Sequence, residues 1–154
     1  FCVANKIIYT RYADDLSFSG DYISNNMIRA IKEIIINCNY SINERKVRLQ
    51  TKQSAQYVTG IKVNSKLNVN RKYIRQLRSI LHDWEINGLE NASSRYYAGK
   101  KHHYQSQLDM YDAFKASVYG KLVFLKQVKQ EEPVIQALFN RFYLLSEPSV
   151  EKIN

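Results

Sequence analysis

The spacing of apolar residues changes near residue 64, and this change limits what the chain can fold into. Residues 6–12 are β-branched and aromatic, and residues 16–19 alternate between apolar and polar, which is typical of strands. From residue 70 onward, apolar residues recur every three or four positions, as on one face of a helix. The sequence therefore predicts an α+β fold for residues 1–64 and an all-α bundle for residues 65–154.

The α+β region is expected to open with a β-hairpin, because residues 13–15 form a short connection between the two strands. Ser24 or Asn25 can cap a following helix, whose apolar positions are Met27, Ile31, Ile34, Ile35 and Cys38. On this face we expect Cys38 to be a small core residue. Residues 42–49 and 56–63 are predicted to form short strands or strand-loop segments.

Capping signals divide the α region into successive helices. The predicted elements are a helix from Asn70 to Asn87-Gly88, a short helix over Leu89–Tyr97, a helix over 103–118 before Gly120, one or two turns over 121–129, and a helix that begins at Pro133. The side chains expected to face inward are Tyr73, Ile74, Leu77, Leu81, Trp84, Leu108, Tyr111, Phe114, Val118, Ile135, Leu138, Phe139 and Phe142.

Composition excludes some classes of site. The chain has 2 cysteines without a CxxC spacing, so we expect no zinc site, and this low count fits a reducing cytoplasm. We also expect no membrane partner, because no apolar run approaches the roughly 18 residues that a span requires.

Positive charge is concentrated in one stretch of the chain. The net charge is +9, and residues 41–80 hold ten basic residues against the single acid Glu44. Four of these bases, Arg71, Lys72, Arg75 and Arg78, have helical spacing opposite the apolar positions. Such a band is expected of a protein that binds a phosphate backbone, although a solvated basic face is an equally common explanation.

Two adjacent carboxylates, Asp14 and Asp15, occupy the predicted hairpin turn. A solvated turn explains them simply, since aspartate is a favoured turn residue. Clustered carboxylates also suit two-metal phosphoryl transfer, in which two Mg²⁺ ions clamp the attacking and leaving oxygens.

Three segments, in order, resemble motifs of bacterial retron-type reverse transcriptases. Thr10–Gly20, with its Tyr12-Ala13-Asp14-Asp15 core, resembles the catalytic motif C, and Ile42–Lys46 resembles motif D. Tyr57–Asn64 resembles the primer grip, motif E, and contains the Val-Thr-Gly triplet that retron enzymes use to recognise their own RNA. The resemblance implies the C-terminal part of a polymerase palm over residues 1–64 and a helical thumb over residues 65–154.

The resemblance also implies roles for individual residues. Asp14 and Asp15 would be catalytic metal ligands, with Asp14 the better candidate for contacting both Mg²⁺ ions, and Lys46 would act on the leaving pyrophosphate. The implied nucleic-acid contacts are Tyr12 near the primer terminus, Thr59 and Gly60 at the primer, and Arg71, Lys72, Arg75 and Arg78 on phosphates.

The implied function is RNA-directed DNA synthesis in the bacterial cytoplasm, with a noncoding RNA as template-primer and a cDNA as product, in anti-phage defence with an effector protein. The family's motif A aspartate and fingers are absent, and Asp21 cannot replace that aspartate because it follows the second strand. We therefore expect an N-terminal partner segment of the same enzyme and no polymerisation by these residues alone. The alternatives are another bacterial defence-associated or group II intron-type reverse transcriptase, and a non-catalytic RNA-binding palm and thumb module.

Overall fold

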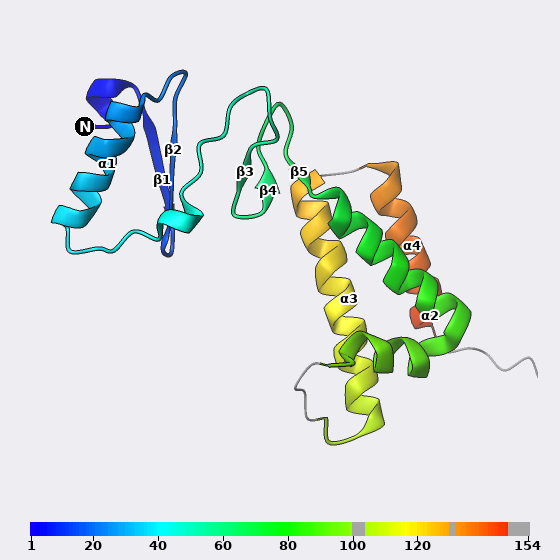
Figure 1. Cartoon of the computed structure of the whole chain (residues 1–154). Helices are drawn as coiled ribbons and strands as arrows, with labels where there is room; N and C mark the ends of the chain where they lie inside the picture. Colours follow the sequence, from blue (N-terminus) through cyan, green and yellow to red (C-terminus); the bar gives the residue numbers. More distant parts are fainter. Residues whose placement is uncertain (100–103, 130–131, 148–154) are drawn as a thin grey trace, which may run out of the picture. The chain divides into compact units, whose positions relative to one another are not determined.

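The computed structural model describes residues 1–99, 104–129 and 132–147 of the chain. Its internal contacts divide the chain into two units. The first unit covers Phe1–Thr59 and the second begins at Gly60. Figure 1 shows that strands and one long helix make up the first unit, and that helices dominate the second.

The first unit begins with a short 3-10 turn at Val3–Asn5, followed by the predicted β-hairpin. Strands β1 (Ile8–Tyr12) and β2 (Asp15–Ser19) pair antiparallel. Tyr12 lies opposite Asp15, so the turn between the strands consists of Ala13 and Asp14. Tyr9 and Phe18 face each other across the pair, with ring centroids 5.2 Å apart.

Helix α1 (Asn25–Asn37) begins where the capping signal predicts, because Ser24 Oγ accepts a hydrogen bond from Met27 N at 3.2 Å. Of its apolar residues only Ile31 is buried, at 8% exposure. Cys38 is exposed, so its prediction as a core residue is wrong. A two-stranded hairpin offers too little surface to cover the whole apolar face of the helix.

Residues 42–49 form no strand; they contain the 3-10 turn η2 (Glu44–Lys46) instead. Asn43 turns the backbone here, because its Oδ1 accepts a hydrogen bond from Arg45 N at 3.2 Å. The strand predicted for this segment is therefore not observed.

Three short strands follow, β3 (Tyr57–Val58), β4 (Ile61–Lys62) and β5 (Asn68–Val69), in a sheet of order β3-β4-β5. Strands β4 and β5 pair antiparallel with Ile61 opposite Val69. Val69 is buried in the core of the second unit, and Ile61 packs against that core. Residues 60–64 therefore associate with the helical region instead of ending the region before it.

The helical region contains α2 (Arg71–Tyr97), α3 (Gln107–Lys129) and α4 (Pro133–Ser146). Asn70 caps α2, since its Oδ1 accepts from Lys72 N at 2.9 Å, and Pro133 occupies the first turn of α4, both as predicted. The predicted break at Gly88 is also confirmed, because α2 kinks there with φ 76° and ψ 170°. For the helix predicted over 103–118, which corresponds to α3, the predicted first residue, 103, lies outside the described residues.

Gly120 does not end a helix, contrary to the prediction. Helix α3 continues through it, because buried positions recur at helical spacing on both sides, with Phe114 and Val118 before it and Leu122 and Leu125 after it. Leu108, predicted to face inward, is exposed near the start of α3. Burial on α3 therefore begins about two turns later than the apolar pattern suggests.

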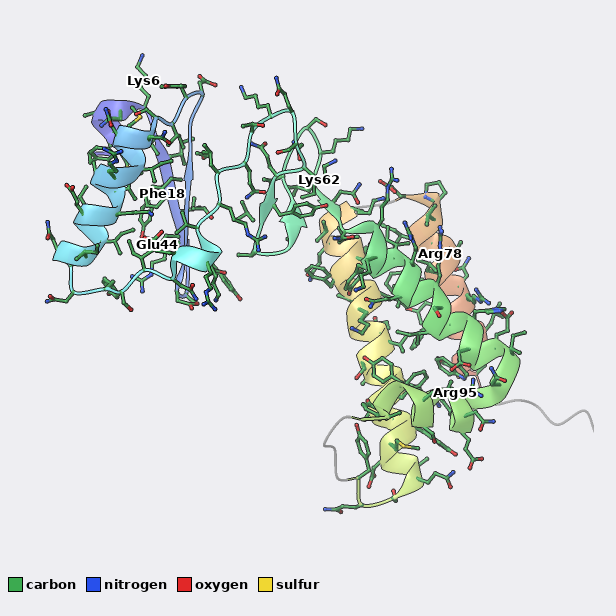
Figure 2. All side chains as sticks on the ribbon, viewed as in Figure 1. Lys6, Phe18, Glu44, Lys62, Arg78 and Arg95 are labelled. Carbon is green, nitrogen blue, oxygen red and sulfur yellow. The ribbon has the colours of Figure 1, made fainter. Side chains whose placement is uncertain are left out.

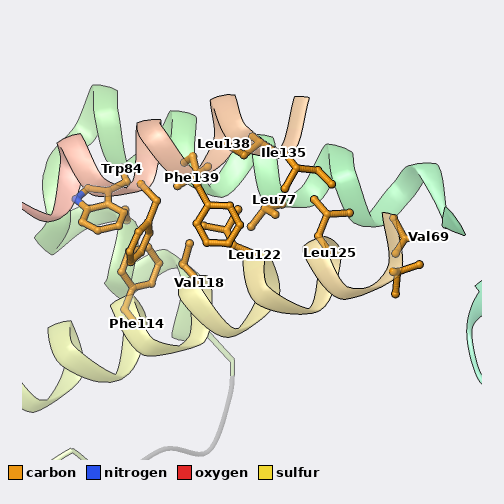
Figure 3. Packing of buried hydrophobic residues seen from close by; sticks show 14 residues of the cluster. Val69, Leu77, Trp84, Phe114, Val118, Leu122, Leu125, Ile135, Leu138 and Phe139 are labelled. Carbon is orange, nitrogen blue, oxygen red and sulfur yellow. The ribbon is translucent and has the colours of Figure 1, made fainter. Parts of the chain in front are cut away.

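One hydrophobic core lies between α2, α3 and α4 (Figure 3). Trp84 packs edge-on against Phe114 and Phe142, with ring centroids 5.3 Å and 5.8 Å away. The Tyr73 hydroxyl donates to the Lys121 carbonyl at 3.0 Å, which ties α2 to α3. Within the described residues, no helix is both long and apolar enough to cross a membrane.

Candidate catalytic hairpin and nucleic-acid interface

The tightest turn of the first unit carries the candidate catalytic carboxylates. Ala13 has φ 50°, in the left-handed region that a two-residue hairpin turn requires. Arg11 supports this turn from β1, because its Nε donates to the Ala13 carbonyl at 2.8 Å. The Arg11 guanidinium also lies 6.0 Å from the ring centre of Tyr40. The sequence prediction missed Arg11, although its position two residues before the turn was a usable signal.

The turn exposes three side chains that the sequence predicts to be functional. Asp14 lies in the turn, Asp15 opens β2, and both are exposed. Tyr12, opposite Asp15, is 72% exposed. The structure therefore brings Tyr12, Asp14 and Asp15 together at one end of a hairpin, where a ligand can reach them.

Two exposed carboxylates fit part of a Mg²⁺ ligand set, because this ion prefers a few carboxylates together with water and phosphate oxygens. No group of three or more His, Cys, Asp or Glu side chains that could hold a metal was found in the part of the chain that the structure describes. Asp21 lies beyond β2 and pairs with Lys52 at 3.3 Å. The described residues thus offer two candidate carboxylate ligands, Asp14 and Asp15.

Lys46 ends the turn η2, elsewhere in the first unit, and is exposed. Glu44 of the same turn pairs with Lys32 of α1 at 2.6 Å. The Lys46 backbone N–H also donates to the Asn43 carbonyl at 2.9 Å. These contacts hold the backbone of the segment, and the Lys46 side chain is exposed to solvent.

Thr59 and Gly60 form a second tight turn, between β3 and β4, with φ of 47° and 85°. Positive φ at both residues is typical of a type I′ hairpin turn, and it is unfavourable for a β-branched threonine. Gln50 secures the strand before it: its Oε1 accepts from Tyr57 N at 2.6 Å, and its Nε2 donates to the Tyr57 carbonyl at 3.0 Å. The sequence prediction also missed Gln50, and no local pattern marks it.

The four predicted phosphate-binding bases lie on α2, in the second unit. Arg71, Lys72, Arg75 and Arg78 are all exposed, whereas Leu77 and Leu81 on the opposite side are buried. Figure 2 shows the position of Arg78 on this helix. The helix therefore presents a cationic outer face over a fully packed inner face.

The chain was also compared with known proteins. It is 41% identical over 76 residues to the Retron Mx65 reverse transcriptase of Myxococcus xanthus, a match that covers 48% of this chain and 18% of that protein. It is 31% identical over 111 residues to the Retron Ec83 reverse transcriptase of Escherichia coli, covering 64% of this chain and 34% of that protein.

The chain thus spans about a fifth and a third of the length of these two relatives. No family model matches it, and no solved structure matches it significantly. Both relatives are retron reverse transcriptases, as the resemblance in the sequence predicted. The chain is a relative of the retron reverse transcriptases.

Proposed function

We propose that this chain is the C-terminal palm and thumb portion of a retron-type RNA-directed DNA polymerase. The observation that carries the proposal is the two-residue turn that exposes Asp14 and Asp15 beside Tyr12, in a chain related to retron reverse transcriptases. Arg11 holds this turn in place, so the two adjacent carboxylates are presented together to solvent.

In this function, Asp14 and Asp15 would hold the catalytic Mg²⁺ ions together with a third carboxylate from outside the described residues. The chemistry that two bound Mg²⁺ ions supply is activation of the primer hydroxyl and neutralisation of charge on the leaving pyrophosphate. Tyr12 would contact the primer terminus. Lys46 would either transfer its proton to the leaving pyrophosphate or stay protonated and stabilise its negative charge. The Thr59-Gly60 turn brings backbone close to the primer, since glycine lacks a side chain that would prevent the approach.

The second unit serves as the thumb in this proposal. The exposed basic side chains of α2 contact phosphates of the template-primer without reading its sequence. Guanidinium and ammonium groups pair with phosphates regardless of which nucleobase the nucleotide carries. The template-primer is a structured noncoding RNA and the product a cDNA, as in enzymes named for retrons. Defence against phage with an effector protein is the setting proposed on the same grounds.

The decisive experiment replaces one carboxylate in the full polymerase that contains this chain. Asp14→Asn should reduce primer extension on an RNA template to background, because an amide is a poor ligand for a hard cation. Asp21→Asn is the matched control and should extend normally, since Asp21 lies outside the turn and pairs with Lys52. Normal extension by Asp14→Asn would instead favour the alternative that this portion of the polymerase binds RNA and takes no part in catalysis.

A second substitution tests Lys46. Lys46→Ala should slow single-nucleotide incorporation by about 10²-fold, the lower end for loss of a general acid. Arg45→Ala, which removes the adjacent exposed charge of the same turn, should leave the rate nearly unchanged. Equal effects of the two substitutions would show that the segment contributes only general positive charge.

A further inference from the structure

The second unit contains a surface pocket of about 620 Å³ that α2 and α4 line together. Its apolar lining comes from α4, and the cationic or ionisable side chains around it come from both helices. The apolar residues are Val134, Ala137 and Leu138, and the cationic or ionisable ones are Arg78, His82 and Arg141. A groove with an apolar wall and basic side chains suits a ligand with both apolar surface and negative charge.

This pocket continues the cationic face of α2. Arg71, Arg75, Arg78 and His82 follow one another at intervals of four, three and four residues, so they form one row along the helix. At 1.5 Å per residue the row is roughly 16 Å long, enough to follow several nucleotides of one strand. The pocket lies at its C-terminal end, where α4 adds Arg141.

Arg141 is held in the pocket by two residues of α2. Its Nη2 forms an ion pair with Glu85, and it also lies 3.3 Å from His82 Nδ1, which acts as acceptor because a guanidinium only donates. The pair remains open to solvent, with the Arg141 side chain 31% and the Glu85 side chain 49% exposed. Both contacts are made by Nη2, whereas a guanidinium carries five N–H donors.

We infer that the groove between α2 and α4 seats the backbone of the bound RNA, with a phosphate on Arg78 and Arg141 and a ribose against Val134 and Leu138. Glu85 acts as the internal counter-ion of Arg141, and the phosphate competes with it. This inference rests on the proposed function, because the ligand is the RNA proposed above. Nucleic acid is favoured over an acidic protein segment because the groove extends the row of basic side chains along α2.

The two members of the ion pair should have opposite effects on RNA affinity. Arg141→Ala removes a charged donor and should weaken binding of a labelled RNA hairpin by roughly tenfold. It should also lower the slope of log Kd plotted against the logarithm of the salt concentration by about 1. Glu85→Gln removes a nearby negative charge and should tighten binding by about two- to threefold.

A matched ion pair in the same unit provides the control. Arg95 and Asp83 form a partly exposed pair across the kink of α2, outside this groove. Arg95→Ala and Asp83→Asn should therefore leave RNA affinity unchanged. Arg141→Lys keeps the positive charge and should recover most of the affinity lost in Arg141→Ala, because lysine still binds phosphate as a point charge.

Fluorescence anisotropy of the 154-residue chain, without metal or nucleotide, measures these affinities, and circular dichroism follows the folding of each variant. Tighter binding by Glu85→Gln cannot come from unfolding, so this variant keeps the test valid if Arg141→Ala is unstable. The inference is overturned if Glu85→Gln does not tighten binding while Arg141→Ala loses only thermal stability. It is also overturned if Arg141→Ala weakens binding of an acidic peptide but leaves the affinity for RNA unchanged.

Binding of RNA by this chain does not require catalysis, so the two proposals fail in different ways. If the wild-type chain binds RNA and Arg71→Ala weakens it but Arg141→Ala does not, only the groove assignment is wrong. If the wild-type chain binds no RNA, the thumb role in the proposed function is wrong as well.

Discussion

The two units of the chain differ in how much of their apolar surface they bury. The first unit has two buried hydrophobic residues, Ile7 at 5% and Ile31 at 8% exposure, and all the others of the described core belong to the second unit. Yet the candidate catalytic residues Asp14, Asp15 and Lys46 lie in the first unit. Chemistry and packing are therefore assigned to different parts of the molecule.

The first unit combines a small core with local hydrogen bonds. Its hairpin leaves Ile8, Tyr9 and Leu16 exposed, and an isolated two-stranded hairpin is marginally stable in water. The unit instead relies on the Ser24 cap and on the Arg11 contact to the turn. We therefore expect the first unit to open more readily than the second, and the following substitutions test this difference.

The largest effect is expected from Phe114→Ala, which empties a position that is fully buried in the second unit. This change should cost about 3–5 kcal/mol of unfolding free energy, because it removes a large side chain and leaves a cavity. Urea denaturation followed by circular dichroism measures it. Ile31→Ala, in the first unit, should leave the main transition unchanged; a similar loss would show that the two units unfold together.

A smaller loss is expected from Gly88→Ala at the kink of α2. The backbone there has φ 76° and ψ 170°, a region almost restricted to glycine, although an added Cβ meets no atom within 4 Å. The strain should cost about 1–3 kcal/mol in thermal or urea unfolding of the second unit. Gly120→Ala, inside α3, is the control and should be neutral or stabilising, since that glycine is helical and also has open space.

Ser24→Ala tests the stability of α1 in the first unit. Loss of the hydrogen bond to Met27 N should cost the helix about 1 kcal/mol. Hydrogen exchange should then accelerate in α1 and stay constant in α3. Asn70→Ala removes the equivalent cap from α2, and there the packed inner face should limit the change to the first turn. Equal acceleration throughout both units would contradict their independence.

The smallest effect concerns pH. Burial, and secondarily the neighbouring Tyr96, raises the pKa of Tyr73 above its ordinary value. The folded state thus favours the neutral hydroxyl of Tyr73. The stability that this hydroxyl contributes to the folded state is complete below the ordinary tyrosine pKa of about 10, and it is lost as the pH rises through the pKa of Tyr73 in the folded state. Tyr73→Phe should flatten the fall of Tm above about pH 10. An unchanged slope would exclude Tyr73 as its source.

Much of the fold is predictable from short-range chemistry. The hairpin turn, the caps at Ser24 and Asn70, the break at Gly88 and the start at Pro133 each depend on residues within about four positions of one another. The pair Asp14-Asp15 is visible in the same way, as is the basic spacing along α2. Their roles in catalysis and binding remain predictions.

The sequence by itself therefore determined the hairpin turn, the helix starts at Ser24, Asn70 and Pro133, and the break at Gly88. Only the tertiary structure decided that Cys38 is exposed, that α3 passes through Gly120, and that Arg141 meets Glu85. Capping and turn geometry act between neighbours in the chain, so a sequence displays them directly. Burial and ion pairing between helices depend on which surfaces are available to pack, and residues 56 positions apart meet only after the helices have folded together.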